Sequence, residues 1–354
     1  MKAAVYRGPN DVRVEEVPTP EPGPGEVILR VEACGVCGTD LKKIAHGDLT
    51  PPRIFGHEVA GQVASVGPGV TRWRPGERAV FFHHIPCRAC GLCRTGAYAQ
   101  CPQYLKVGTT AGFEPAGGGF AEFVRVMDWI VKDGLIRIPE GVEPEEASFV
   151  EPVNTCLKGI RKAGIGKGGS VLILGAGPVG LTLLQLARLA GGNCYVSDLI
   201  PERLTAAKSL GAADTFLGSP SGHPEPGRRV ADWARQRIDP RGADVVLVAA
   251  SSAQAVQAAI DAARPAGRVV LFAQTRVGEM ASVDVGQIGK LEKELVGSYS
   301  ASVDLQEEAA HLVFSRAIQV KPLVTHRFGL DKIQEAIRVA MNPSAQSLKI
   351  VVKP

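Results

Sequence analysis

A run of four apolar residues, 171–174, leads directly into a glycine turn and constrains the fold more than any other part of the chain. A strand that is apolar on both faces is typical of the centre of a parallel sheet covered by helices on both sides. The turn reads G-x-G-x-x-G, and its residues are Gly175, Gly177, Pro178, Val179 and Gly180. In this motif the first glycine makes the tight turn, the second lets the backbone approach a pyrophosphate, and the third lets the helix lie close to the strand. The N-terminus of the helix then faces phosphate groups.

The residues after the turn provide the context that this motif requires. A helical pattern continues to Ala190 and stops at a pair of glycines, and a second apolar strand, 194–197, then ends in Asp198. An acid about 20 residues beyond the glycines binds the ribose hydroxyls of NAD and repels the 2′-phosphate of NADP. Arg203 follows in the next helix, where we expect it to pack on the adenine or face solvent. The pattern therefore predicts an NAD site, and a plain buried helix after a flexible loop is the alternative.

The alternation of strands and helices continues beyond this motif. Six strands separated by helices make a complete doubly wound parallel sheet of the α/β class. The strands are expected at 171–174, 194–197, 214–217, 245–249, 269–272 and 294–298. The segment 219–227, which is rich in serine, proline and glycine, is expected to be a surface loop. Beyond residue 305 the pattern predicts two helices and a last strand, 348–352, that returns to the first domain.

Composition narrows the class of function. A chain of 354 residues is expected to form two domains, each with a full core. Its 40 basic and 36 acidic residues leave a net charge of +4, which gives no electrostatic footprint for nucleic acid or an anionic membrane. No apolar run is long enough to span a bilayer and the N-terminus shows no signal segment, so we expect a cytoplasmic protein. Eight cysteines in such a chain favour thiolate or metal chemistry over disulfides.

Half of these cysteines lie close together with the spacing C-x2-C-x2-C-x7-C. They are Cys87, Cys90, Cys93 and Cys101. Four thiolates on a short loop close a tetrahedral zinc site with no open position, and such a site contributes folding energy instead of catalysis. An iron–sulfur cluster also uses four cysteines, but this spacing matches neither common ferredoxin pattern. A zinc ribbon for nucleic acid would require a basic, aromatic environment, and only Arg88 and Arg94 are near.

The N-terminal part of the chain, up to about residue 131, is rich in glycine and proline and shows short alternating strands, which predicts an irregular β domain. It contains Cys37 and, twenty residues later, the pair His57 and Glu58. A thiolate, an imidazole and a carboxylate are ligand types that zinc takes in catalytic sites. The glycines around the pair show no packing role of their own in the sequence. The three residues are candidates for a second metal site, although a lone cysteine or histidine is more often a core residue.

These motifs occur together in one order: Cys37-Gly38-Thr39-Asp40, Gly56-His57-Glu58-x-x-Gly61, the four-cysteine loop, and the glycine turn with Asp198. In this combination essentially the whole chain resembles the zinc-dependent medium-chain dehydrogenase/reductases. The resemblance implies a GroES-like catalytic domain over 1–152, a Rossmann NAD-binding domain over 153–294, and a C-terminal segment, 295–354, that returns to the catalytic domain. It also implies one catalytic and one structural Zn²⁺ per chain, with NAD as the cofactor.

Glu151 narrows the resemblance to one branch of this superfamily. Where classical alcohol dehydrogenases carry a zinc-binding cysteine, this chain has Glu151 followed by proline, which is similar to the sorbitol, threonine and galactitol-phosphate dehydrogenases. In that branch residues of the Cys37, His57 and Glu58 type hold the catalytic metal, and the Glu151 type binds directly or through water. The chain departs from the branch at Lys42, where many members have a histidine thought to relay protons.

The resemblance implies an enzyme that oxidises a secondary alcohol on a polyol, sugar or similar small molecule to a ketone. Thr39 is expected to pass the hydroxyl proton toward bulk water, and the loop 108–115 is expected to line the substrate pocket. The nearest alternative is a threonine-type amino alcohol dehydrogenase. A non-catalytic nucleotide-binding or lens-crystallin-like relative is the alternative of a different class, but such relatives tend to lose zinc ligands that this chain retains. Members of the family form homodimers or homotetramers by pairing the last Rossmann strand, here 294–298.

Overall fold

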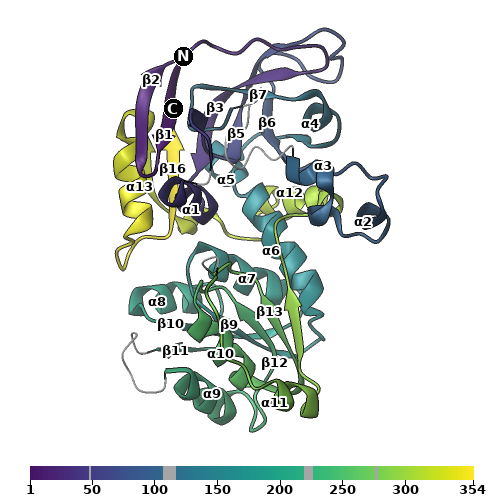
Figure 1. The fold of residues 1–354 in the computed structure, drawn as a ribbon, viewed down its shortest axis with the longest axis vertical. Helices are drawn as coiled ribbons and strands as arrows, with labels where there is room; N and C mark the ends of the chain where they lie inside the picture. The colour runs from purple at the N-terminus through teal and green to yellow at the C-terminus, as the bar shows by residue number, and fades with distance from the viewer. Residues whose placement is uncertain (48, 107–116, 219–225, 276–277) are drawn as a thin grey trace. The chain divides into compact units, whose positions relative to one another are not determined.

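The computed structural model describes residues 1–47, 49–106, 117–218, 226–275 and 278–354. Within them the chain divides into two compact units (Figure 1). One unit comprises Met1–Asn154 together with Ala301–Pro354, and the other comprises Thr155–Ser300. The predicted substrate loop 108–115 and most of the predicted surface loop 219–227 lie outside the described residues. None of the described helices is long and apolar enough to cross a membrane.

The second unit is built on a six-stranded parallel sheet. Its strands are β9 (Ser170–Leu174), β10 (Asn193–Asp198), β11 (Asp214–Leu217), β12 (Ala243–Val248), β13 (Ala263–Leu271) and β14 (Glu294–Gly297). Their order in the sheet is β11-β10-β9-β12-β13-β14, and every neighbouring pair is parallel. The predicted doubly wound α/β fold is therefore confirmed. Because the strand order reverses beside β9, the carboxyl end of this strand is where such folds bind their ligands.

Helices alternate with these strands along the chain (Figure 1). They are α7 (Pro178–Leu189), α8 (Pro201–Ser209), α9 (Pro226–Arg237), α10 (Ala253–Ala262) and α11 (Val285–Lys290). The apolar run of β9 is fully buried, with Val171, Leu172 and Ile173 all 0% exposed. This burial explains why the strand is apolar on both faces, since helices cover both sides of such a sheet.

The first unit is rich in strands. Its larger sheet has seven strands, with the order β15-β16-β3-β5-β6-β8 and with β7 paired to β3, and its smaller sheet has the order β2-β1-β4. The strands are β1 (Lys2–Gly8), β2 (Asp11–Glu16), β3 (Val27–Gly35), β4 (Arg53–Ile54), β5 (Glu58–Val66), β6 (Arg78–Phe81), β7 (Phe123–Val126), β8 (Leu135–Arg137), β15 (Val324–Gly329) and β16 (Lys349–Lys353). The last strand, β16, pairs with β3 in this sheet, with Val352 opposite Cys34.

Short helices connect these strands. They are α1 (Gly38–His46), α2 (Gly91–Arg94), α3 (Pro102–Lys106), α4 (Asp128–Asp133), α5 (Pro144–Ala147), α12 (Gln306–Phe314) and α13 (Ile333–Met341). A further helix, α6 (Val150–Ala163), begins in this unit and continues into the other.

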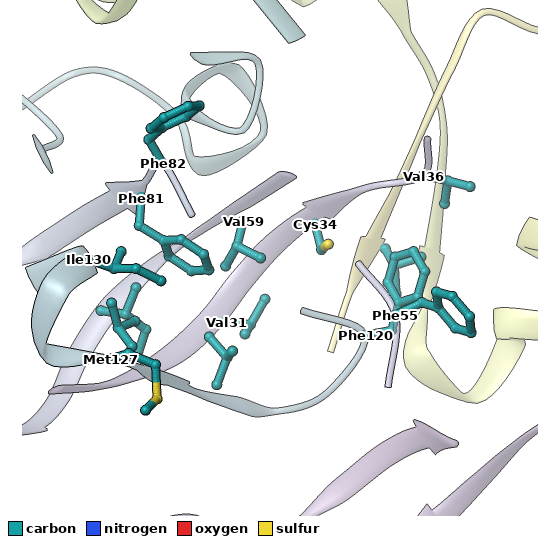
Figure 2. Close-up of a cluster of buried hydrophobic side chains, with 14 of the residues drawn as sticks. Val31, Cys34, Val36, Phe55, Val59, Phe81, Phe82, Phe120, Met127 and Ile130 are labelled. Carbon is teal, nitrogen blue, oxygen red and sulfur yellow. The ribbon is translucent and has the colours of Figure 1, made fainter. Parts of the chain in front are cut away.

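A cluster of buried apolar side chains holds the larger sheet of the first unit together (Figure 2). Its members include Val31 of β3, Val59 of β5 and Phe81 of β6, together with Met127 and Ile130 from the region of α4. Each of these side chains is at most 7% exposed. Burial of one such side chain stabilises a fold by about 1.5–3 kcal/mol, so the cluster fixes the ends of β3 and β5 relative to one another.

Candidate active site

Three potential zinc ligands meet at the ends of two paired strands. The ligand atoms of Cys37, His57 and Glu58 all lie within 4.8 Å of one another. The strand register explains this proximity, because Gly35 at the end of β3 is paired with Glu58 at the start of β5. His57 and Glu58 are buried, whereas Cys37 is partly exposed, and a side chain added at Gly38 would meet no atom within 4 Å. Three protein ligands of sulfur, nitrogen and oxygen type, with a fourth position left for water or substrate, are typical of a catalytic zinc site.

Asp40 orients two of these ligands, a role that the sequence did not reveal. Its carboxylate accepts hydrogen bonds from Nδ1 of His57 at 3.0 Å and from the backbone N–H of Cys37 at 3.1 Å. With Nδ1 held in this way, Nε2 of His57 is the nitrogen available to a metal ion. Burial lowers the pKa of His57, but the charges of Asp40 and Cys37 outweigh burial and hold this pKa well above its usual value. The sequence does contain a helix-capping pattern that places Asp40 next to Cys37. Asp40 is the third residue of α1, and a carboxylate at this position accepts a hydrogen bond from the backbone N–H of the residue before the helix.

Lys349 of β16 is a second buried group that the sequence did not reveal. Its Nζ forms an ion pair with Oε2 of Glu58 and donates a hydrogen bond to the carbonyl of Val36 at 3.1 Å. Burial lowers the pKa of Lys349, but Glu58 and Cys37 outweigh burial and raise it. A side chain at Gly35 would clash with Oε2 of Glu58 and with the Lys349 side chain, so only glycine leaves room for the pair. Lys349 therefore compensates the negative charge of Glu58, which is buried and so cannot be solvated by bulk water.

The glycines around His57 have packing roles, which corrects the expectation from the sequence. Gly56 has a positive φ of 97°, and a side chain there would lie 2.7 Å from Sγ of Cys34. A side chain at Gly61 would clash with the carbonyl of Arg30 on β3, close to a point where the register of β3 and β5 shifts. These close contacts depend on pairing between distant segments, and so they leave no local pattern in the sequence.

Thr39 and Lys42 both lie in α1, directly after Cys37. The backbone N–H of Thr39 donates to Sγ of Cys37 at 3.5 Å, and the Thr39 side chain is partly buried. Burial lowers the pKa of Lys42, and the charge of Cys37 opposes this effect. Both residues therefore belong to the surroundings of the metal ligands.

Glu151, at the start of α6, is buried but is not among the three residues whose ligand atoms lie within 4.8 Å of one another. Burial raises the pKa of Glu151 to about 7, and the charges of His57 and Glu58 act on it in opposite directions. The structure thus brings Glu151 into the electrostatic environment of the centre without bringing it into the group of three.

In the metal-free protein, Glu151→Gln is expected to raise the free energy of unfolding more at about pH 8 than at about pH 5. The folded protein holds the Glu151 proton up to a pKa of about 7, whereas an unfolded glutamate loses it near pH 4.3. Wild-type stability is therefore lost as the pH rises between these values. Glutamine removes this loss, which is on the order of 3 kcal/mol. Urea unfolding of both proteins across this pH range measures the difference, and parallel pH profiles would contradict the prediction.

The four cysteines of the loop between β6 and α3 form a second group, with all four sulfur atoms within 4.8 Å of one another. The Sγ atoms are 3.5 Å apart for Cys90 and Cys93, 3.5 Å for Cys87 and Cys101, and 3.9 Å for Cys87 and Cys93. Thiolates bound about 2.3 Å from a tetrahedral zinc ion lie about 3.8 Å apart, so the spacing fits this ion. Burial raises the pKa of Cys101, but backbone N–H groups of Cys87 and Tyr104 outweigh it and lower this pKa to about 6. A thiolate is the form that binds metal.

The glycine turn joins β9 to α7 in the other unit. Gly175 has a positive φ of 105°, Gly177 precedes the helix, and Pro178 and Val179 are its first residues. A side chain at Gly180 would clash with the carbonyl of Gly175, so the backbones of helix and strand lie in close contact. The free N–H groups at the start of α7 provide the type of site that holds phosphate groups.

Asp198 is the last residue of β10 and lies beside the glycine turn. Its carboxylate accepts hydrogen bonds from the backbone N–H groups of Ala176 and Ile200, the latter at 2.9 Å. Arg203 lies in the first turn of α8 and is partly buried. The carboxylate of Asp198 is thus fixed between the turn and α8, at the carboxyl edge of the sheet.

Comparison with known proteins agrees with this arrangement. Residues 23–140 match the model of the alcohol dehydrogenase GroES-like domain, and residues 178–315 match that of the zinc-binding dehydrogenases. Sorbitol dehydrogenase of Bos taurus is 30% identical over 99% of this chain and 95% of its own length.

Solved structures give the same result. A zinc-binding dehydrogenase of Sinorhizobium meliloti with NADP bound is 32% identical, with a TM-score of 0.87 over 100% of this chain and 99% of its own. Galactitol-1-phosphate dehydrogenase of Escherichia coli is 28% identical, with a TM-score of 0.84 over 100% of both chains. The chain belongs to the zinc-dependent medium-chain dehydrogenase/reductases, in the branch that includes the sorbitol and galactitol-phosphate dehydrogenases.

Proposed function

We propose that this chain oxidises a secondary alcohol of a polyol, sugar or sugar derivative to a ketone, with NAD as the hydride acceptor. The observation that carries the proposal is the group of Cys37, His57 and Glu58, whose ligand atoms lie within 4.8 Å of one another, in a chain that also contains a dinucleotide fold. Relatives named for sorbitol and galactitol 1-phosphate support a polyol substrate, so we favour it over the amino alcohol alternative.

In this proposal Cys37, His57 and Glu58 hold the catalytic zinc ion, and Asp40 keeps the His57 ring in its binding orientation. Zinc bound there would lower the pKa of the substrate hydroxyl, and NAD would accept the hydride. Lys349 neutralises Glu58 from the side of β16, which reduces the cost of keeping a carboxylate buried.

In this proposal Thr39 transfers the proton of the substrate hydroxyl, and Glu151 contributes to the coordination of the catalytic zinc ion. Thr39, two residues after Cys37 and partly exposed, takes the hydroxyl proton and passes it toward bulk water. Glu151 binds the metal directly or through water. In the metal-free protein burial raises the pKa of its carboxyl group to about 7, and the charge of a bound Zn²⁺ would lower this pKa and favour the carboxylate that binds.

The experiment that tests the proposal is a panel of polyols, sugars, sugar phosphates and amino alcohols with NAD⁺, measured by the absorbance of NADH. Turnover of one or more polyols is the expected result. Turnover of threonine without turnover of any polyol would instead support the amino alcohol alternative.

We also propose that the protein is a homodimer or homotetramer that pairs β14 with its copy. β14 is an edge strand of the six-stranded sheet, and Leu295 and Tyr299 expose 38% and 44% of their surfaces. Light scattering at micromolar concentration is expected to give at least twice the mass of one chain. Leu295→Lys should shift the protein toward the monomer, because a charge on an edge strand opposes pairing. A monomeric wild-type protein would contradict this prediction.

A reducing compartment such as the cytoplasm suits both proposed metal sites. All eight cysteines are free thiols in the structure, including the four of the cysteine loop. Thiols persist in this state where disulfides are reduced, and the proposed zinc sites depend on them.

A further inference from the structure

Two buried histidines, His83 and His84, follow the end of β6 and take no part in the proposed mechanism. His83 is 0% exposed, and neither of its ring nitrogens has a hydrogen-bond partner in the part of the chain that the structure describes. Its ring lies beside that of His57, with centroids 5.5 Å apart and an edge-on orientation. A buried polar ring with no hydrogen-bond partner among the described residues is therefore adjacent to one of the three proposed metal ligands.

The ring of His83 packs against residues that flank the four-cysteine loop. The rings of His83 and His84 have centroids 3.8 Å apart, and the ring of His84 stacks on Tyr104 at 4.3 Å. His84 lies three residues before Cys87, and Tyr104 lies three residues after Cys101. Residues next to both ends of the cysteine loop thus pack in a row with His83, although the rings of His83 and His84 are tilted by 52° and only His84 and Tyr104 are stacked.

The chemistry of His83 suits a hydroxyl group. His83 is fully buried, and burial favours the neutral form of its ring because a charged imidazole would lose its hydration. A neutral imidazole has one N–H donor and one acceptor nitrogen, which matches a hydroxyl group and offers no charge to a phosphate or carboxylate. A buried polar group left unpaired is costly, so a substrate that pairs with it is selected over one that presents only an alkyl group.

The spacing then selects the position of that hydroxyl on the substrate. Hydroxyl oxygens on adjacent carbons lie about one hydrogen-bond length apart. When one of them is at the centre formed by Cys37, His57 and Glu58, the other lies within about one hydrogen-bond length of that centre, and the ring of His83 adjoins one of its ligands. We propose that His83 binds the hydroxyl group next to the reacting carbon and so selects vicinal diols over simple secondary alcohols. This inference rests on the proposed alcohol oxidation.

The test compares 2,3-butanediol with 2-butanol as substrates of the zinc-loaded enzyme with NAD⁺. His83→Phe is expected to lower kcat/KM for the diol by about tenfold or more, and to change kcat/KM for 2-butanol by less than about threefold. His83→Asn, which keeps a donor and an acceptor, should recover part of the preference for the diol. His84→Phe is the matched control, because it keeps an aromatic ring on Tyr104, and it should leave the ratio of the two substrates unchanged.

A binding measurement by NMR, which needs no catalytic turnover, complements the comparison of kcat/KM values. In the zinc-loaded wild-type protein without NAD, the nitrogen-15 resonances of the His83 ring should shift on addition of 2,3-butanediol and not on addition of 2-butanol. This readout decides the question even if His83→Phe fails to fold, which the melting temperature would reveal.

Three outcomes would overturn the inference: equal losses on both alcohols in His83→Phe, a change of ratio in His84→Phe alone, or resonances that do not respond to the diol. In each case oxidation of both alcohols by the wild-type enzyme would leave the proposed function standing. Failure of the wild-type enzyme to oxidise any alcohol of the panel would instead count against the proposed function.

Discussion

Treatment of the zinc-loaded protein with a mild chelator is expected to abolish alcohol oxidation and to leave the fold intact. The group of Cys37, His57 and Glu58 offers only three ligands and Cys37 is partly exposed, so a chelator can compete for a metal ion held there. The cysteine loop offers four thiolates that fill a tetrahedral shell, which leaves no position for a competing ligand. Elemental analysis should find two zinc ions per chain before treatment and one after it, and circular dichroism should stay unchanged.

Two cysteine variants separate the sites. Cys37→Ser should retain one zinc ion and lose about a thousandfold or more in kcat, because Lewis-acid stabilisation is worth several kcal/mol and each 1.36 kcal/mol is a factor of ten. Its melting temperature should change little. Cys90→Ser should lower the melting temperature strongly, since a structural zinc site contributes folding energy. Active protein with one zinc ion or none would contradict this account.

A preference for NAD over NADP of at least about tenfold to a hundredfold in kcat/KM is the second expected result. Asp198 ends β10 beside the glycine turn, where a carboxylate binds the ribose hydroxyls and repels a 2′-phosphate. A hydrogen bond to a charged group is worth about 1.5–3 kcal/mol, which sets the size of the preference. A similar solved structure contains NADP, so both cofactors have to be compared directly.

The variants of Asp198 must distinguish its charge from its structural hydrogen bonds. Because the carboxylate also accepts from the backbone N–H groups of Ala176 and Ile200, Asp198→Ser removes both functions. Asp198→Asn removes the charge and keeps one acceptor oxygen. Both variants should lose preference mainly through KM for NAD. The melting temperature should fall less in the asparagine variant than in the serine variant, because asparagine keeps one of the two accepting oxygens. Equal or better kcat/KM with NADP in the wild-type enzyme would show that Asp198 does not bind the ribose.

The dinucleotide fold could be predicted because its signals are local. Three contiguous elements carry these signals: the buried strand β9, the glycine turn and α7. Each of them requires particular residue types at neighbouring positions of the chain. The cysteine loop was equally readable, because its four thiols lie within 15 residues. Patterns of this kind depend little on the rest of the molecule.

The surroundings of the metal ligands could not be predicted in the same way. The ion pair of Lys349 with Glu58 joins the last strand to β5, and a charged residue near the end of a chain is usually solvated. The close approach at Gly61 depends on the register of β3 and β5, which the sequence leaves open. No local pattern in the sequence indicates that His83 lies beside His57. All three follow from long-range pairing rather than from spacing.

The most direct test of the central claim is a zinc titration of the metal-depleted protein with a polyol substrate and NAD⁺, in which NADH formation is recorded against bound zinc. The cysteine loop should fill first without activity, and activity should then rise in proportion to the second zinc ion and reach its maximum at two per chain. The Cys37→Ser protein should bind only the first ion and stay inactive. NADH formation by the wild-type protein before the second ion binds, or by Cys37→Ser at a comparable rate, would contradict the assignment of Cys37, His57 and Glu58 as the catalytic centre.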